Sequence, residues 1–155
     1  MRPFLLLLFL GCLLAWGAER PAPAGAGGES GYPFVTNYTP RVYGGDAQNW
    51  AVLQDSRGLI YVGNNRGVLE YDGVRWTLIP TTRHTVVRSL GMDAQGRVYV
   101  GAVGEIGCLV PNDHGEIHFQ SLNERLPDSV RTFSDVWATL ATPRGVLFQT
   151  REFLF

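Results

Sequence analysis

The chain is built from short apolar runs that are separated by turns containing glycine. The segments "LIYVG" at 59–63 and "RVYVG" at 97–101 are almost continuously apolar. The segment "VRWTLI" at 74–79 alternates instead, with Trp76 and Leu78 on one predicted face. Because successive side chains of a β-strand point to opposite faces, alternation predicts an outer strand and a continuous run predicts a central strand covered on both sides. The pattern therefore predicts an all-β chain.

These strands recur in copies. The segments "WAVLQDSRGLIYVG" from Trp50, "RSLGMDAQGRVYVG" from Arg88 and "WATLATPRGVLFQT" from Trp137 align with one another. One glycine position is shared by all three copies and is occupied by Gly58, Gly96 and Gly145. A period of about forty residues with four short antiparallel strands per copy is typical of the blades of a β-propeller.

The copies do not add up to a closed ring. The first spans 50–79, the second spans 87–122, and the third begins at Trp137 and reaches "REFLF" at 151–155. This is about two and a third blades, whereas a propeller closes with about four to eight. We predict an incomplete β-propeller of four-stranded antiparallel blades, as part of a longer protein. A β-sandwich with accidental self-similarity is the alternative.

Aspartate and glycine mark the turns. Asp72-Gly73 predicts a two-residue hairpin loop of type I′, in which both central residues need a positive φ. Gly67 also suits a position with positive φ. Asp72, Asp113 and Glu116 lie in or beside turns, where a carboxylate accepts backbone hydrogen bonds. We therefore expect these carboxylates to serve the turns and not to form a catalytic pair.

The N-terminus differs in composition from the rest. Residues 1–17 contain a basic residue, an apolar run and small residues, which is the pattern of a secretory signal peptide. The run is shorter than the roughly 20 residues of a membrane-spanning helix. Residues 18–33 are rich in Pro, Ala and Gly and predict a flexible linker. A short buried helix, or a lipoprotein signal using Cys12, are the alternatives. The predicted domain is 34–155, and we expect it to be exported to the periplasmic or extracellular side of a bacterial membrane.

Composition narrows the function classes. The chain is 45% hydrophobic and 17% charged with a net charge of −1, which is an ordinary globular balance without a basic surface for nucleic acid. Cleavage of the signal would leave Cys108 as the one cysteine, and its apolar context predicts a small buried side chain. His114 and His118 lie four apart in a predicted turn and strand, where they would be about 13 Å apart. We expect no metal, no cofactor and no catalytic residues in this chain.

A ligand site can be placed by topology. In a propeller, the loops from the second to the third strand and those between blades lie at one end, and the remaining turns lie at the other. The first set is longer and richer in hydrogen-bonding groups, and loops on a rigid scaffold commonly bind ligands. The candidate ligand-binding residues are Asn64, Asn65, Arg66, Arg83, His84, Glu105 and Arg125. The first three are the strongest candidates; a simple solvated turn is the alternative interpretation of them.

The repeats resemble the two-component regulator propeller repeat. That pattern runs Asp-x-x-Gly, apolar residues with an aromatic, a glycine, and then a glycine turn. The first copy matches it at Asp55, Gly58, Tyr61, Gly63 and Gly67, and the second matches at Asp93, Gly96, Tyr99 and Gly101. The third departs, with Thr142 in place of Asp and Gln149-Thr150 in place of Val-Gly. The resemblance covers about residues 41 to 155.

The resemblance implies an extracytoplasmic sensing segment of a bacterial signal-transduction protein. The implied partners are an unidentified small ligand, with a glycan as one candidate, further C-terminal blades and a membrane-linked output domain. A homodimer of the full-length protein is a further candidate, and no nucleic acid is expected at this segment. Two alternatives stay open: a fragment of a secreted propeller enzyme that acts on polysaccharide, and a structural or adhesion propeller.

Overall fold

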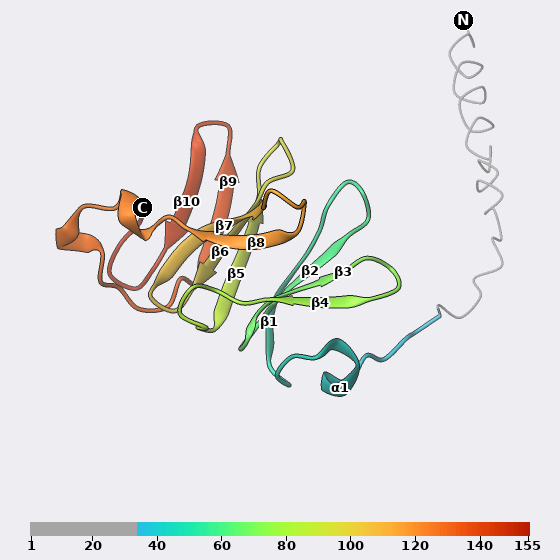
Figure 1. Cartoon of the computed structure of the whole chain (residues 1–155). Helices are drawn as coiled ribbons and strands as arrows, with labels where there is room; N and C mark the ends of the chain where they lie inside the picture. The colour runs from blue at the N-terminus through green and yellow to red at the C-terminus, as the bar shows by residue number, and fades with distance from the viewer. Residues whose placement is uncertain (1–33) are drawn as a thin grey trace, which may run out of the picture. The chain divides into compact units, whose positions relative to one another are not determined.

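The computed structural model describes residues 34–155, and the predicted signal peptide and linker lie outside the described residues. The described part is an all-β structure of ten strands with three short helical turns, as predicted (Figure 1). The helical turns are α1 (Pro40–Tyr43), η1 (Asn123–Arg125) and η2 (Asp128–Val130). In residues 34–155, no helix has the length and apolar character required to cross a membrane.

The strands form three antiparallel sheets in which consecutive strands are neighbours. The first sheet contains β1 (Asn49–Gln54), β2 (Ile60–Asn64), β3 (Gly67–Tyr71) and β4 (Trp76–Ile79). The second contains β5 (Val87–Met92), β6 (Val98–Ala102), β7 (Glu105–Pro111) and β8 (Ile117–Ser121). The third contains β9 (Ala138–Thr142) and β10 (Gly145–Gln149). Beyond β10, Phe148 and Phe155 exchange backbone hydrogen bonds of 3.1 and 3.0 Å, so the last residues pair with β10.

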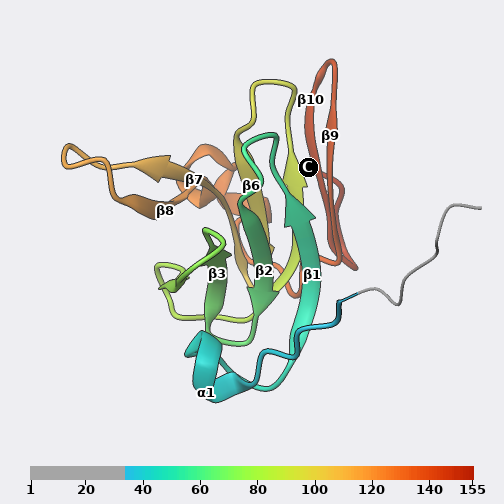
Figure 2. The ribbon, with the colours of Figure 1, turned by 90° about the vertical axis from the view of Figure 1, so that its right-hand side faces the viewer.

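The three sheets are arranged side by side through their first strands. β5 packs between β1 and β9, whereas the fourth strands β4 and β8 contact each other only slightly. In Figure 2, β1, β9 and β10 lie on the right, and β7 and β8 extend to the left. The sheets therefore diverge from a common line of first strands.

Apolar side chains fill the two interfaces between sheets. Tyr61 and Val68 of the first sheet pack with Val87, Val100 and other residues of the second, and all four side chains are almost wholly buried. The interface of the second and third sheets contains Ile106, Phe133, Val136 and Phe148. Cys108 is buried as predicted, and burial raises the pKa of its thiol. The near-continuous apolar runs of β2 and β6 are thus explained by cover on both faces.

The segment before β1 covers part of the first sheet, which the sequence pattern did not indicate. Tyr43 of α1 is buried against Val62 and Leu69, and the predicted pair Trp76 and Leu78 packs on the same cluster. The rings of Tyr71 and Trp76 stack with centroids 4.6 Å apart. Trp76 and Leu78 do share a face, as the alternation in 74–79 predicted.

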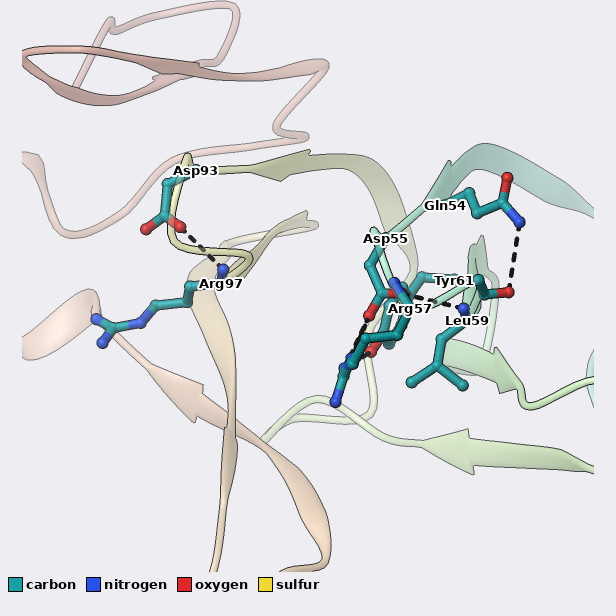
Figure 3. Close-up of polar contacts among 8 residues, drawn as sticks. Gln54, Asp55, Arg57, Leu59, Tyr61, Asp93 and Arg97 are labelled. Atoms are coloured by element: carbon teal, nitrogen blue, oxygen red, sulfur yellow. Dashed lines mark hydrogen bonds and ion pairs between the residues drawn. The ribbon is translucent and has the colours of Figure 1, made fainter.

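Asp55 organises the turn from β1 to β2 (Figure 3). Its Oδ1 accepts hydrogen bonds from the backbone N–H groups of Arg57 (2.8 Å) and Leu59 (3.0 Å). Its Oδ2 accepts bonds from the Arg57 guanidinium at 2.9 and 2.7 Å. Gly58 has a φ of 90°, so the turn needs the residue that adopts this conformation without strain.

The same turn is found twice more in the second sheet. Asp93 Oδ1 accepts from the N–H of Gln95 (3.0 Å) and Arg97 (2.9 Å). Asn112 Oδ1 accepts from the N–H of His114 and Glu116, both at 2.9 Å. In the β7–β8 turn, the side-chain acceptor is therefore Asn112. Asp113 is exposed, so our expectation that Asp113 would serve the turn was wrong.

The hairpin from β3 to β4 also differs from the prediction. Regular pairing ends at Tyr71 opposite Trp76, so four residues connect the strands. Gly73 has a φ of 94°, but Asp72 has no positive φ. Instead, Asp72 Oδ1 accepts hydrogen bonds from the N–H of Val74 (2.8 Å) and Arg75 (2.6 Å). The predicted type I′ turn was wrong because the aspartate side chain closes this loop itself.

Candidate functional site

The sheets have two chemically different ends. At the turn end, compact Asx-type turns join the first strand to the second and the third to the fourth. At the loop end lie the β2–β3 and β6–β7 turns together with the β4–β5 and β8–β9 connections. The loop end contains every residue that topology proposed for ligand binding.

Asn64 is a structural residue of the loop end. Its side chain is wholly buried, and its Nδ2 donates to the carbonyl oxygens of Asp46 (2.8 Å) and Gln48 (3.0 Å). Its Oδ1 accepts from the N–H groups of Asp46 (2.9 Å) and Arg66 (3.0 Å). These bonds tie the segment before β1 to the β2–β3 turn. Because internal partners use both ends of the amide, Asn64 holds the loop end together. A contact between Asn64 and a ligand stays a prediction.

Asn65 and Arg66 lie beside this buried amide. Asn65 Oδ1 accepts a hydrogen bond of 2.8 Å from the Trp50 indole, and Asn65 Nδ2 donates to Asp46 at 3.0 Å. Arg66 is exposed and donates to the carbonyl oxygen of Gly44 at 3.1 Å. Asn65 therefore supports the Trp50 indole, Arg66 bonds the segment before β1, and neither residue lines the cavity described below.

A β-bulge recurs at the loop end of the first strands. The β1–β2 register shifts between Asn49 and Ala51, and the β5–β6 register shifts between Val87 and Ser89. The extra residues are Trp50 and Arg88, which occupy the same position of the repeat. A bulge re-aims the side chain of its extra residue.

The bulged residues stack on one another. The Arg88 guanidinium carbon lies 3.8 Å from the Trp50 ring centroid and 5.2 Å from that of Trp137, the equivalent residue of the third copy. Arg88 Nε also donates to Asp135 Oδ1 at 2.6 Å. The Trp50–Arg88–Trp137 stack thus joins all three sheets through cation–π contacts.

Two buried polar residues, Glu105 and Thr81, hold the β4–β5 connection in place. Glu105 Oε2 accepts from the backbone N–H of Arg83 (3.2 Å) and from the hydroxyl of Thr85 (3.0 Å). Thr81 Oγ1 accepts from the N–H of Thr85 at 2.8 Å. His84 has a φ of 56°, the one positive φ among the non-glycine residues of 34–155. This conformation costs of order 1–3 kcal/mol. The side chains of Arg83 and His84 are exposed.

The β8–β9 connection is fixed by Asn123 and Arg131. Asn123 is buried; it accepts from the N–H of Ile106 (2.9 Å) and donates to the carbonyl of Gly104 (2.8 Å). Arg131 donates to the carbonyl of Leu126 at 2.9 Å and pairs with Asp128 at 2.8 Å. The connection is therefore anchored to the β6–β7 turn and braced within itself.

A cavity of about 330 Å³ lies between these two connections and the β6–β7 turn. It is lined by Arg83, Gly104, Asp128, Arg131, Thr132 and Phe133. The volume lies at the lower end of the range of ligand pockets, about 300–1,000 Å³. Two guanidinium groups, a hydroxyl and an aromatic ring could hold a small polar ligand here.

The structure divides the predicted residues into groups. Arg83 lines the cavity, His84 follows it in the same loop, and Glu105 supports that loop while being only 1% exposed. Arg125 is exposed in η1 but does not line the cavity. The sequence interpretation missed Arg131. The one signal for it was the length of the β8–β9 connection, which has two arginines and no periodic apolar pattern.

Comparisons with known proteins give weak structural likenesses, two of which are described below. No family model matches the chain, and no curated protein matches it. A structure of the extracellular domain of BT4673, a proposed one-component system of B. thetaiotaomicron, matches with a TM-score of 0.44 at 17% identity over 73% of this chain. Another structure, of the extracellular domain of BT4673 described as a proposed hybrid two-component system of the same organism, matches with a TM-score of 0.30 at 18% identity over 68% of this chain. The chain spans 22% and 19% of the length of these structures.

Proposed function

We propose that residues 34–155 form part of an exported β-propeller that binds a small ligand at its loop end and relays binding to a membrane-linked output domain. The chain itself performs no catalysis in this proposal. The observation that carries it is the repeated sheet, stacked through its first strand and bearing a cavity between two braced connections. The resemblance of the repeats to two-component regulator propellers supports the sensory role.

The outward faces of the stack favour further blades. Val52 of β1 pairs with Val62, which faces α1 and away from the second sheet, and Val52 is 74% exposed. Leu140 and Leu147 are partners across β9 and β10, on the face opposite to buried Phe148. Leu140 is 60% exposed. Apolar residues on both outward faces are expected where neighbouring blades would cover them.

A structure of the full-length protein tests the architecture. We expect the sheets of 49–149 to continue into a closed ring of four-stranded blades. Helices or a single sandwich around these sheets would contradict the proposal. Export is tested separately by fusing, after Phe155, a reporter enzyme that is active only outside the cytoplasm.

Ligand sensing is tested at the two ends of the blades. A screen of small molecules by thermal shift on the full-length protein identifies a ligand, and variants then locate it. We expect loop-end substitutions such as Arg83→Gln to weaken binding and to reduce the output signal. The turn-end control Asp113→Asn should leave both unchanged. Equal effects at both ends would contradict a loop-end site.

A further inference from the structure

We infer that the loop-end cavity binds a small organic oxyanion, with the Arg83 guanidinium as its main contact. This inference rests on the proposed function because it names the ligand class of the same end. The residues that line the cavity include two arginines, a threonine and a phenylalanine. Each of these features contributes separately to the choice of ligand.

Arg83 is available for a ligand. Its backbone N–H is bonded to Glu105, but within residues 34–155 its guanidinium takes part in no hydrogen bond or ion pair. Thr81 and Glu105 hold the loop, and His84 keeps a positive φ that non-glycine residues rarely adopt. A braced loop that presents an uncommitted guanidinium is better explained by a ligand than by packing.

Arg131 adds a second guanidinium at a fixed position. Its Nη2 bonds the Leu126 carbonyl and Asp128, while its Nε is shielded from solvent and lacks a partner. Two carboxylates are close. The Asp128 side chain is 90% exposed, so solvent screens its charge, and Glu105 is directed to the backbone of the β4–β5 loop. The cavity wall thus has two cations against one solvated carboxylate.

The shape of the cavity limits the ligand. Phe133 and Thr132 are among the lining residues, and the volume of about 330 Å³ suits a molecule with one ring. The planar fork of a guanidinium matches carboxylate, sulfonate and phosphate oxygens. The expected ligand therefore has a ring-sized body and one oxyanion group.

Three probes on the full-length protein test the inference by isothermal titration at constant ionic strength. Benzoate and benzenesulfonate carry the oxyanion on the same ring, and benzyl alcohol is the neutral control. We expect both anions to bind saturably and the alcohol to bind at least tenfold more weakly. Arg83→Gln should weaken benzoate binding at least tenfold. The affinity of Arg83→Lys should lie between those of Arg83→Gln and the unaltered protein, because lysine keeps the positive charge but lacks the paired donors of the guanidinium.

Arg125→Gln is the matched control, because Arg125 is an exposed arginine at the same loop end, in the β8–β9 connection that also contains Arg131, and it does not line the cavity. It should bind benzoate like the unaltered protein, and thermal unfolding of Arg83→Gln should be unchanged. The inference is overturned if no anion binds, if benzyl alcohol binds as tightly, or if Arg125→Gln and Arg83→Gln lose equal affinity. The tests of the proposed function do not depend on these results, because they use the full-length structure, the export reporter and the thermal-shift screen. Failure of this inference is therefore distinguishable from failure of the proposed function.

Discussion

A single side-chain acceptor at the start of the tight turns recurs through all three copies. Asp55, Asp93 and Asn112 each accept from the backbone two and four residues later. In the third copy, Thr142 Oγ1 accepts from the N–H of Arg144 at 3.2 Å and donates to the Gly145 carbonyl at 2.9 Å. These turns therefore require a side-chain acceptor and not a negative charge. This explains why Thr142 can replace aspartate in the β9–β10 turn and why Asn112 can close the β7–β8 turn.

The charge of Asp55 makes stability depend on pH. Burial alone would raise the pKa of Asp55, but the hydrogen bonds from Arg57 and Leu59 outweigh it and hold the pKa below its usual value. An aspartate with a lowered folded-state pKa stabilises the protein above its unfolded pKa of about 3.9, and this contribution is lost as the pH falls through the folded pKa. We expect the free energy of unfolding in urea to fall below about pH 4.

Asp55→Asn isolates this contribution. Asn112 shows that an amide oxygen can keep the turn, so the variant should lose mainly the Arg57 pair, at a cost of about 1 kcal/mol at pH 7 because Arg57 is largely exposed. The acid-induced loss should be smaller in the variant. Asp113→Asn, in an exposed position, should match the unaltered protein. An identical pH profile for all three proteins would contradict the assignment.

At the scale of elements, the bulges and the stack decide how the sheets are joined. Arg88 of β5 and Asp135 of the β8–β9 connection form an ion pair of 2.6 Å, and their side chains are 17% and 25% exposed. A partly buried, charge-assisted bond beside two indoles should be worth more than an exposed pair. The exposed pair Arg75–Asp72, at 3.9 Å, offers a comparison within the same chain.

Double-mutant cycles measure this difference. We expect a coupling energy of about 1–2 kcal/mol between Arg88→Gln and Asp135→Asn in urea unfolding. The cycle of Arg75→Gln and Asp72→Asn should give about 0–0.5 kcal/mol. Equal coupling in the two cycles would show that the stack does not join the sheets.

Gly67 allows β3 to begin against the end of β4. Its φ is 138°, and an added Cβ would lie 2.4 Å from the carbonyl oxygen of Ile79. Gly115 also has a positive φ, of 82°, but nothing lies within 4 Å of its added Cβ. Gly67→Ala should therefore destabilise the protein by at least about 1 kcal/mol more than Gly115→Ala, because only the former adds a clash to the backbone strain. Urea unfolding of the two variants provides the comparison.

At the scale of the molecule, the two outward faces of the stacked sheets expose apolar side chains. Val52 on one face and Leu140 with Leu147 on the other are exposed apolar residues. If neighbouring blades cover them in the full-length protein, residues 34–155 alone should expose them. Such patches promote association.

We therefore expect the isolated segment 34–155 to associate as its concentration rises, whereas the full-length protein does not, in sedimentation velocity. The double variant Val52→Lys and Leu140→Lys should reduce association of the segment. The same double variant should destabilise the full-length protein, since it would bury two charges between blades. A segment that stays monomeric, or a full-length protein that tolerates the lysines, would argue against further blades.

Much of the architecture follows from the sequence alone, because local patterns specify it. Strands 59–63 and 97–101, the glycine turns and the shared face of Trp76 and Leu78 are set by side-chain alternation and by φ, which depend on neighbours in the chain. The error at Asp72 also has a local cause, since a side-chain acceptor competes with the backbone for the turn. The loop end was predicted because antiparallel connections alternate between two ends.

Only the tertiary structure decided what each loop-end residue does. Asn64 and Asn65 have the same side chain, yet one is buried and bonded internally and the other supports the Trp50 indole. Arg125 and Arg131 lie in one connection, yet only Arg131 reaches the cavity. Burial and cavity walls arise from packing between segments far apart in the chain, so no local pattern of residues contains them.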